Sequence, residues 1–338
     1  MNTVLLLFGG ESSEHEVSIA SAKNVARAIP TGAYYALYGY IDRKGDWWLI
    51  ESLDDSSLAS GQPIICDFEK KVLQVGDKAL AVDVVFPCLH GKSGEDGTIQ
   101  ALLDLLDLPF VGCGVEASQK SIDKVISKQI ASEHGIAVVP YVVYLQGQPM
   151  PNFEELALNL SPTLFVKPAR AGSSVGAHKV LNQGQLDEAV ADALLHDDKV
   201  LIEAALQPRE LEVAVLGNGV KAQASPVGEI LPEGEFYSYE SKYSPDSKSA
   251  AFIPADIPES LADDIRHQAL TVYAALGCEG LSRVDFFLDK NSEDLYFNEI
   301  NTMPGFTDIS MYPKLWEATG ISNEELIDQL LQLALGQK

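Results

Sequence analysis

Two carboxylates, an amide and a guanidinium near the C-terminal end of the chain have the spacing of a metal site beside a phosphate. Asp285 and Glu299 belong to two apolar runs joined by a polar turn, which predict an antiparallel pair of strands. A register that sets these carboxylates opposite each other also sets Arg283 opposite Asn301. Because alternate residues of a strand share a face, we expect all four side chains to meet on one surface, with Phe297 on the same face as Glu299.

Oxygen ligands of this kind suit Mg²⁺ or Mn²⁺. Two carboxylates held this close resist ionising together unless a cation neutralises them. Hard cations take carboxylate and amide oxygens at about 2.0–2.1 Å, and phosphate oxygens commonly complete the octahedron. We therefore expect Asp285, Glu299 and Asn301 to be metal ligands. The alternative is a structural salt bridge from Arg283 to one of the two carboxylates, which leaves the other carboxylate and Asn301 without a role.

A run of small residues from 171 to 176 has the composition of a phosphate-binding lid. Small residues let a loop close over an anion and turn its N–H groups inward, and Ser173 and Ser174 add hydroxyl donors. Lys167 ends the preceding apolar strand, where a core residue would be usual. Strands on both sides predict a hairpin lid, with a mobile surface hairpin as the alternative.

Two further glycine motifs carry less weight. The run 112–117 matches the dinucleotide fingerprint G-x-G-x-x-A, and Glu133 follows at about the required 20 residues. This motif comes late in the chain, so a tight strand-to-helix turn is favoured. The run 90–93, His-Gly-Lys-Ser, is similar to a phosphate-binding P-loop, but Phe86 occupies the position of its first glycine, so we reject it.

The elements that must position these residues change in character along the chain. Apolar runs at 4–8, 34–41 and 82–86 predict strands, and helices are expected after Glu16 and over 97–106. Such alternation is typical of a mostly parallel sheet with helices on its faces.

Beyond residue 118, strands are expected in pairs. The run 163–167 should pair with 178–181, and 200–204 with 210–216, before a long helix over 259–276. The expected fold class is therefore α/β at the N-terminal end and α+β afterwards.

Three domains follow from this division. We expect an N-terminal parallel-sheet α/β domain over 1–121. A central lobe with the glycine-rich lid should cover 122–213, and a C-terminal lobe with the metal site should cover 214–338. Two lobes that face each other make a natural cleft for a cofactor.

Composition and charge exclude several classes of protein. The 338 residues include 46% hydrophobic and 22% charged residues, a normal globular mixture. A net charge of −25 repels phosphate backbones, so we expect no nucleic-acid partner, although cations focused in a cleft could still bind a nucleotide. We find no signal peptide and no apolar run that could span a bilayer, which predicts a cytoplasmic protein without a membrane partner. The cysteines and histidines show no metal-ligand spacing, so zinc is not expected.

The chain resembles the ATP-grasp superfamily and, within it, the D-alanine–D-alanine ligases. The resemblance rests on an ordered series of motifs that covers nearly the whole sequence: 8–10 with 14–18, 90–91 with 94–97, 123–124, 166–168 with 172–176, 237–243, 283–285, 298–301 and 304–305. Each motif is short, but their order makes the set specific. The resemblance implies a two-lobed ATP-grasp fold that follows an N-terminal substrate-binding domain, with 237–243 as a mobile omega loop.

The resemblance also implies a ligase reaction in two steps. One D-alanine carboxylate takes the γ-phosphate of ATP to form an acyl phosphate, and the amine of a second D-alanine then displaces phosphate. The products are ADP, phosphate and the D-alanyl-D-alanine used for peptidoglycan precursors. Two Mg²⁺ (or Mn²⁺) ions and a cytoplasmic homodimer are implied as well.

For the nucleotide and the metal, the resemblance implies specific contacts. Asp285, Glu299 and Asn301 would hold the two ions, with Glu299 touching both. Glu203 would accept a hydrogen bond from the adenine amino group, and Glu210 would accept from the ribose hydroxyls. The other expected contacts are the phosphate-binding lysines and the remaining nucleotide neighbours, namely Lys124, Lys167, Ser174, Lys242, Asn298 and the backbone of Ala205 and Leu206.

For the bond-forming step, the resemblance gives roles to four residues. Arg283 and the Gly305 N–H would stabilise the oxyanion of the tetrahedral intermediate. Ser310 would hold the carboxylate of the second D-alanine through its hydroxyl, and Met311 would do so through its backbone.

The first D-alanine and the lid would be joined by a second group. Glu16 would anchor the ammonium of the first substrate, and Ser173, Tyr243 and Glu16 would form a hydrogen-bonded chain from the lid to the site. Tyr243 is expected to favour an amine over D-lactate as the nucleophile. His90 would lie near the carboxylate of the first substrate, with a satisfied core histidine as the alternative.

Three other functions remain open on the sequence alone. Another carboxylate–amine ligase of the superfamily would use a different amino acid. A nucleotide-binding regulator would keep the fold without turnover, although binding alone needs neither Arg283 nor the loop at His90. An NAD-dependent dehydrogenase would rest on the motif at 112–117.

Overall fold

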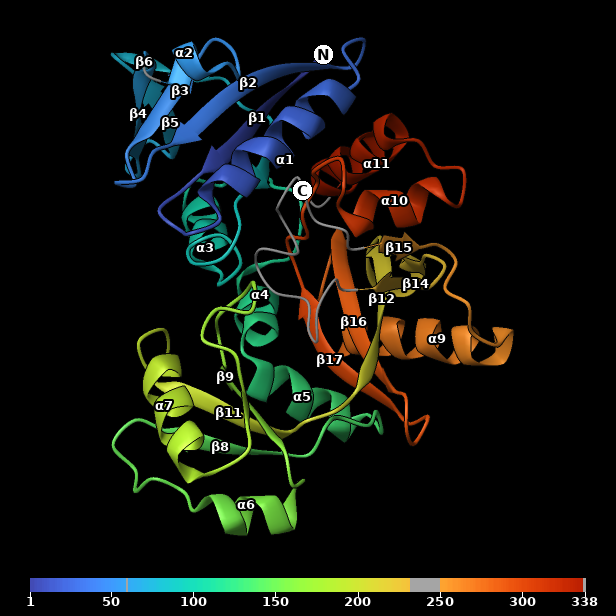
Figure 1. The fold of residues 1–338 in the computed structure, drawn as a ribbon. Coiled ribbons are helices and arrows are strands. Elements are labelled where there is room, and N and C mark those ends of the chain that lie inside the picture. Colours follow the sequence, from blue (N-terminus) through green and yellow to red (C-terminus); the bar gives the residue numbers. More distant parts are fainter. Residues whose placement is uncertain (59, 232–249, 337–338) are drawn as a thin grey trace.

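The structure is a computed structural model that describes residues 1–58, 60–231 and 250–336. Over these ranges the chain forms three sheets, one for each third of the sequence. The N-terminal sheet lies at one end of the molecule and a four-stranded sheet at the other, with a six-stranded sheet between them to one side (Figure 1). No helix in the described part of the chain is both long and apolar enough to cross a membrane.

The N-terminal sheet is mixed. Its parallel part joins β1 (Asn2–Gly9) to β2 (Tyr34–Ile41) on one side and to β7 (Val84–Cys88) on the other, as expected. An antiparallel extension that the sequence did not predict continues from β2 in the order β3 (Trp47–Ile50), β4 (Gln62–Asp67), β5 (Val72–Val75) and β6 (Lys78–Ala79).

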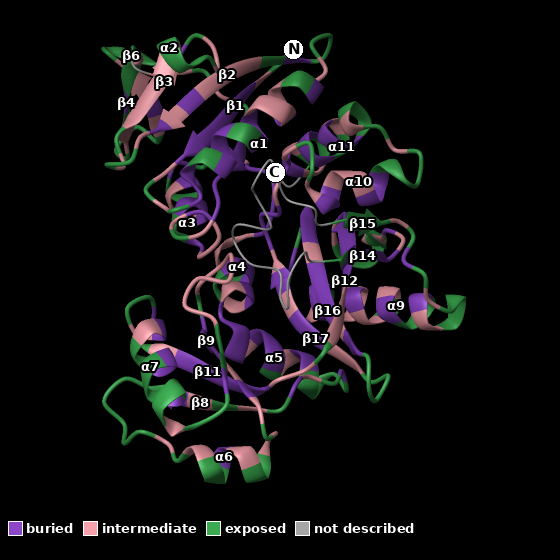
Figure 2. Cartoon of the chain, viewed as in Figure 1, coloured by how far each residue is buried: buried purple, intermediate pink, exposed green. Residues whose placement is uncertain are grey.

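Strand β1 shows why the N-terminal sheet has helices on both faces. Its alternate side chains enter two different cores: Val4, Leu6 and Phe8 pack with α1 (His15–Ala28), whereas Leu5 and Leu7 pack with α3 (Thr98–Leu105). A strand buried on both sides reads as a continuous apolar run, which is the pattern of residues 4–8 (Figure 2). A short helix, α2 (Asp55–Leu58), lies between β3 and β4.

Two consecutive helices lead from the N-terminal sheet to the rest of the chain. The motif at 112–117 forms the tight turn that precedes α4 (Val115–Ile122), as the favoured interpretation predicted. The backbone of Gly112 packs so closely on Gly280 that a Cβ at Gly280 would come within 3.0 Å of it. The next helix, α5 (Lys124–Glu133), is capped by Asp123, whose carboxylate accepts hydrogen bonds from the first N–H groups of the helix.

The four-stranded sheet has the order β10-β9-β11-β8 and is antiparallel throughout. Its strands are β8 (Tyr141–Leu145), β9 (Leu164–Pro168), β10 (His178–Val180) and β11 (Lys199–Ala204), and its helices are α6 (Phe153–Asn159) and α7 (Gln183–Ala193). The expected pairing of 163–167 with 178–181 is confirmed as β9 with β10. The expected pairing of 200–204 with 210–216 is wrong, because β11 already has a partner on each edge.

The six-stranded sheet has the order β15-β14-β12-β16-β17, with β13 paired to β12. Its strands are β12 (Pro208–Leu216), β13 (Gln223–Ala224), β14 (Gly228–Leu231), β15 (Ala250–Phe252), β16 (Leu281–Asp289) and β17 (Leu295–Asn301). The expected domain boundary at 213/214 falls inside β12. The chain instead passes from the second sheet to the third at 205–207.

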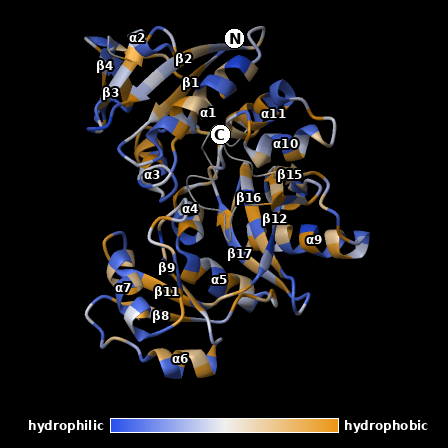
Figure 3. Cartoon of the chain, viewed as in Figure 1, coloured by the Kyte–Doolittle hydropathy of each residue, from blue (hydrophilic) through white to orange (hydrophobic). Residues whose placement is uncertain are grey.

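Among the described residues, three helices accompany this sheet. They are α9 (Glu259–Ala275), α10 (Met311–Glu317) and α11 (Asn323–Leu335). A 3-10 turn, η1 (Gly219–Lys221), links β12 to β13. Along α9 the buried side chains recur at helical spacing and include Ile265, Ala269 and Val272, while hydrophilic residues occupy its other side (Figure 3).

A β-bulge in the last strand pair changes which side chains reach the cleft. The register pairs Asp285 with Glu299, as predicted, but then pairs Phe286 with Phe297, so Asn298 is the extra residue on β17. Phe297 is consequently buried in the core against Phe286, and its expected place on the face of Glu299 is wrong. The bulge lets Asn298 and Glu299, two successive residues, both line one pocket.

Candidate active site

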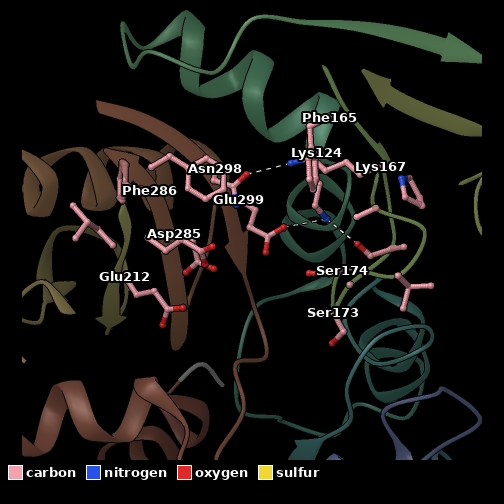
Figure 4. A pocket seen from close by; sticks show the side chains of 18 residues that line it. Lys124, Phe165, Lys167, Ser173, Ser174, Glu212, Asp285, Phe286, Asn298 and Glu299 are labelled. Atoms are coloured by element: carbon pink, nitrogen blue, oxygen red, sulfur yellow. Dashed lines mark hydrogen bonds and ion pairs between the residues drawn. The ribbon is translucent and has the colours of Figure 1, made fainter. Parts of the chain in front are cut away.

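Two adjoining pockets lie where the three sheets meet. The first, here called the lid pocket, is lined by the turn between β9 and β10, the start of α5, and strands β12, β16 and β17 (Figure 4). The second, here called the loop pocket, is lined by N-terminal loops and by residues 303–311. Both pockets share Gly172, Ser173, Glu212 and Glu299, so the two pockets adjoin along these residues.

The predicted metal ligands come together with a cation beside each carboxylate. The register sets Arg283 opposite Asn301, as expected. Arg283 donates two hydrogen bonds to Asp285, at 2.7 and 2.6 Å. The Asn301 amide donates to the same carboxylate at 3.1 Å. Glu299 pairs with a different cation, Lys124, whose Nζ lies 3.1 Å from its Oε2 (Figure 4).

A third carboxylate, Glu212, completes this charge cluster. Its Oε2 lies 3.2 Å from Nε of Arg283, and Glu212 pairs with Asp285 across β12 and β16. Burial opposes the charge on Arg283, but Asp285 and Glu212 together raise the pKa of the guanidinium above its ordinary value. Glu212 was not among the predicted site residues. Its sign in the sequence is a carboxylate two residues after Glu210, at the start of an apolar run.

The donor set fits a divalent cation that a phosphate also binds. Asp285 lines the lid pocket, Asn301 lines the loop pocket and Glu299 lines both, and such oxygen ligands suit Mg²⁺ or Mn²⁺. Within the described residues, no three His, Cys, Asp or Glu side chains form a metal cage of their own. Water or oxygen atoms of a substrate would complete the coordination of a metal held by these residues.

The lid is a sharp turn tied to two other parts of the chain. Ser173 and Ser174 adopt left-handed backbone conformations, with φ of 52° and 58°. The Ser173 hydroxyl donates to Oε1 of Glu14 at 2.5 Å, and Nζ of Lys124 donates to the Ala171 carbonyl at 2.9 Å. The expected hairpin lid is therefore present, and its tip contacts the N-terminal loop.

The predicted role of Glu16 needs correction, because the structure brings Glu14 to the lid instead. Glu14 is 7% exposed and lines the loop pocket, whereas the Glu16 side chain is 73% exposed and pairs with Arg43 at 2.6 Å. Helix α1 begins at His15, and successive helical residues turn by about 100° around the axis. The two glutamates of the Glu-His-Glu motif therefore point in opposite directions.

His90 lies in the loop pocket with both ring nitrogens engaged. Its Nε2 lies 3.0 Å from the Ser21 hydroxyl, and its Nδ1 lies 3.2 Å from the Met303 carbonyl. Burial lowers its pKa, so the ring is neutral. These contacts match the alternative of a satisfied core histidine, although the ring still lines the pocket.

Glu95 is a buried acid that lies in the motif at 94–97 and was not among the predicted site residues. It lines the loop pocket, and its Oε1 lies 4.0 Å from Nδ1 of His90. Burial, together with the nearby charge of Glu14, raises the pKa of Glu95 to about 8. A carboxyl group with this pKa is mostly protonated at neutral pH and can donate a hydrogen bond.

The remaining residues predicted to contact substrate also meet in the loop pocket. Arg283, Gly305, Ser310 and Met311 all line it. A Cβ at Gly305 would come within 2.8 Å of the Ser310 hydroxyl, so a side chain at 305 would crowd the pocket. Ser310 in turn accepts a hydrogen bond from the Thr307 N–H at 2.9 Å, which fixes the loop before α10.

The predicted nucleotide contacts divide into two groups. Lys124, Lys167, Ser174, Glu210 and Asn298 line the lid pocket. Glu203, Ala205 and Leu206 lie outside that lining, at the end of β11 and in the connection that follows. Lys242 and Tyr243 lie outside the described residues, as does the rest of the 237–243 motif.

Glu203 is buried between two lysines. Its carboxylate lies 2.9 Å from Nζ of Lys128 and 2.7 Å from Nζ of Lys167. Burial opposes its charge, but the two ammonium groups outweigh burial and lower the pKa of Glu203 to about 2. Lys128 was missed in the sequence because it lies on the inner face of α5, where a lysine gives no sign of its partner.

Comparisons with known proteins agree over the whole chain. The family model described as "D-ala D-ala ligase N-terminus" matches residues 3–113, and the one described as "D-ala D-ala ligase C-terminus" matches residues 130–332. A D-alanine–D-alanine ligase from Chlorobium phaeovibrioides is 48% identical, over 98% of this chain and 97% of its own. One from Oceanobacillus iheyensis is 43% identical, over 98% of this chain and 94% of its own.

Solved structures show the same similarity in three dimensions. The D-alanine–D-alanine ligase from Coxiella burnetii has a TM-score of 0.87 at 35% identity, covering 100% of this chain and 96% of that one. The VanG D-Ala:D-Ser ligase from Enterococcus faecalis has a TM-score of 0.89 at 35% identity, covering 98% and 99%. With both halves matched by the family and the ATP-grasp fold shared throughout, this chain belongs to the D-alanine–D-alanine ligase family.

Proposed function

We propose that this protein joins two D-alanines to D-alanyl-D-alanine at the expense of ATP, for peptidoglycan precursor synthesis. The observation that carries the proposal is the junction of the two pockets at Glu299 and Ser173. The lid pocket contains lysines that can bind phosphates. In the loop pocket, Arg283 and the Gly305 backbone can stabilise negative charge that develops on a reacting carboxyl group. Phosphoryl transfer to a carboxylate needs this adjacency, because the reacting atoms must approach in line.

In the first step, a carboxylate oxygen of the first D-alanine attacks the γ-phosphorus of ATP and ADP leaves, which forms an acyl phosphate. Glu14, in place of Glu16, would hold the ammonium of this substrate, since its carboxylate faces the loop pocket. Lys124 and Lys167 would hold the phosphates, with Ser174 and Asn298 beside them. Two divalent ions bound by Asp285, Glu299 and Asn301 would neutralise the phosphate oxygens.

In the second step, the amine of the second D-alanine attacks the carbonyl carbon and loses a proton. The C–O bond to phosphate then breaks, and phosphate departs with the bonding pair. Arg283 and the Gly305 N–H would stabilise the oxyanion in between, while Ser310 and Met311 would hold the second carboxylate. The contact of Ser173 with Glu14 would keep the lid over the acyl phosphate and exclude water.

The adenosine half of ATP would lie at the β11–β12 end of the lid pocket. Glu210 lines the pocket there and would accept from the ribose hydroxyls. Glu203 would accept from the adenine amino group, with the backbone of Ala205 and Leu206 alongside. The Ala205 N–H already donates to the Thr163 carbonyl at 3.0 Å, so the backbone is fixed at this point.

The test is phosphate release from Mg-ATP with D-alanine, with L-alanine and with no amino acid, combined with mass spectrometry of the product. We expect release and dipeptide only with D-alanine. Release that does not depend on D-alanine would reject the proposal. Adding D-serine or D-lactate as the second substrate would show whether the acceptor site is strict, and Tyr243 leads us to expect an amine acceptor. Sedimentation velocity tests the expected homodimer, since one chain has a mass of 36.5 kDa.

A further inference from the structure

A buried charge cluster lies behind the lid pocket. Lys128 on α5 is 0% exposed, and its Nζ lies 2.9 Å from Oε1 of Glu203 on β11. Lys167 on β9 approaches the other oxygen of the same carboxylate at 2.7 Å. Three elements of the fold therefore place two cations on one anion.

Lys128, Lys167 and Glu203 together carry two positive charges and one negative charge, so the cluster has a net charge of +1. The two ammonium groups lower the pKa of Glu203 against the effect of burial, so its carboxylate is charged. Burial lowers the pKa of Lys128, and the charge of Glu203 opposes that shift. Lys124 does not change this balance, because it pairs with Glu299. A surplus cation away from water favours the approach of an anion.

The two lysines differ in what they can reach. Lys167 lines the lid pocket, and its Nζ also donates to Oδ1 of Asn298 at 3.3 Å (Figure 4). Lys128 is fully buried and does not line that pocket, and its Nζ also lies 3.5 Å from the Phe297 carbonyl. An anion in the lid pocket could therefore draw Lys167 away from Glu203 but would leave Lys128 in place.

We propose that Lys128 is a positioning residue, the permanent counter-ion of Glu203, which releases Lys167 to the nucleotide phosphates. This inference rests on the proposed function, because it takes ATP as the occupant of the lid pocket. Lys128 keeps Glu203 charged and oriented for the adenine amino group after Lys167 has left. Without Lys128, Lys167 would be the sole counter-ion of a buried carboxylate and would stay with it.

The test compares ADP with adenosine in the full chain. Lys128→Met keeps the length of the side chain and removes its charge. We expect the dissociation constant of Mg-ADP, measured by calorimetry, to rise by about tenfold, the loss of one hydrogen bond to a charged group. Adenosine makes no phosphate contact, so its affinity should change by less than about threefold, which is under 1 kcal/mol. Lys120→Met is the matched control, because Lys120 forms a surface pair with Glu116, and it should change neither value.

A double-mutant cycle separates this role from a purely structural one. The Glu203→Gln variant has no carboxylate at this position that could hold Lys167. In this background, Lys128→Met should therefore not weaken ADP binding further. An unchanged tenfold loss in that background would overturn the proposal. So would an equal loss for adenosine and ADP in the single variant, or no loss for ADP.

A structure of the wild-type chain with ADP tests the same exchange if Lys128→Met does not fold. We expect Nζ of Lys167 at a phosphate and Lys128 still paired with Glu203. Lys167 remaining on Glu203 would overturn the inference. Failure of the proposed function looks different: the wild-type chain would then bind neither ADP nor adenosine, whereas failure of this inference alone leaves wild-type binding intact.

Discussion

The Ser173 hydroxyl donates a hydrogen bond of 2.5 Å to the Glu14 carboxylate, across 159 positions of the chain. The contact joins the tip of the lid to the loop before α1, and both residues line the loop pocket. The lid is therefore closed onto the substrate side of the site rather than only onto the nucleotide side. The carboxylate that accepts this hydrogen bond belongs to Glu14, whereas the prediction was Glu16.

Replacing each of the two neighbouring glutamates separates these assignments. Glu14→Gln weakens the lid contact and removes the proposed anchor for the first ammonium. Because a hydrogen bond to a charged group contributes about 1.5–3 kcal/mol, we expect the KM for D-alanine at the first site to rise about tenfold or more. Glu16→Gln, at an exposed position paired with Arg43, should leave it unchanged. The opposite ranking of the two variants in initial-rate kinetics would restore the assignment to Glu16.

Glu95 should make the stability of the metal-free protein depend on pH. Its pKa is raised from 4.5 to about 8, so between these values the folded chain binds a proton that the unfolded chain has lost. Folding stability is then highest below about pH 4.5 and falls as the pH rises towards 8, by on the order of a few kcal/mol from this group.

The measurement is urea unfolding at pH 5.5 and pH 8. Glu95→Gln keeps the shape and the hydrogen-bonding capacity of the protonated acid but does not titrate. The decrease in unfolding free energy from pH 5.5 to pH 8 should therefore be much smaller in this variant than in the wild type. An equal decrease in both proteins would show that other groups carry the pH dependence.

Much of the arrangement proposed to bind metal could be predicted because it depends on local patterns. Alternation within two adjacent apolar strands placed Arg283 opposite Asn301 and Asp285 opposite Glu299, and the structure has this register. The bulge at Asn298 could not be predicted in the same way. An extra residue in a strand changes which face each later side chain occupies without changing the composition.

The prediction of Glu16 failed for a different reason. It came from the resemblance, and the matching motif holds two glutamates two residues apart. Only the fold shows that Glu14 lines the pocket while Glu16 is exposed and pairs with Arg43. Glu212 and Lys128 failed for a third reason. Each is a charged side chain whose partner lies on a separate element, so only the assembled fold shows that Glu212 meets Arg283 and Lys128 meets Glu203.

Glu299 lines both pockets, and its loss should stop the reaction without unfolding the chain. Glu299→Gln removes the charge proposed to touch both ions, and we expect Mg-dependent turnover to fall by at least about a hundredfold. The side chain is partly exposed, and Lys124 keeps its hydrogen bond to the Ala171 carbonyl, so the circular dichroism spectrum and the urea midpoint should change little. A variant that turns over at the wild-type rate would contradict the assignment of Glu299 as a metal ligand.

Glu212 is not assigned as a metal ligand, but replacing it should raise the Mg²⁺ concentration that turnover requires. In the structure Arg283 lies between Asp285 and Glu212, so a metal that takes Asp285 leaves Glu212 as the partner of the guanidinium. Glu212→Gln removes the second negative charge beside Arg283, so Asp285 becomes the only charged partner in this trio and holds the guanidinium more firmly. If the lost interaction is about 1.4 kcal/mol, the Mg²⁺ concentration for half-maximal turnover rises about tenfold, and excess Mg²⁺ restores the rate.

Asp285→Asn is the matched comparison for Glu212→Gln. It removes a proposed metal ligand, whereas Glu212→Gln removes a residue that competes with Asp285 for Arg283. Excess Mg²⁺ should therefore not restore turnover in Asp285→Asn. Calorimetric titration of Mn²⁺ into each variant with ADP present would report metal binding independently of the rate. Glu212→Gln with wild-type metal affinity would mean that Arg283 does not compete for Asp285. The ion pair seen between these two residues would then persist when the metal binds, and Asp285 would serve both partners at once.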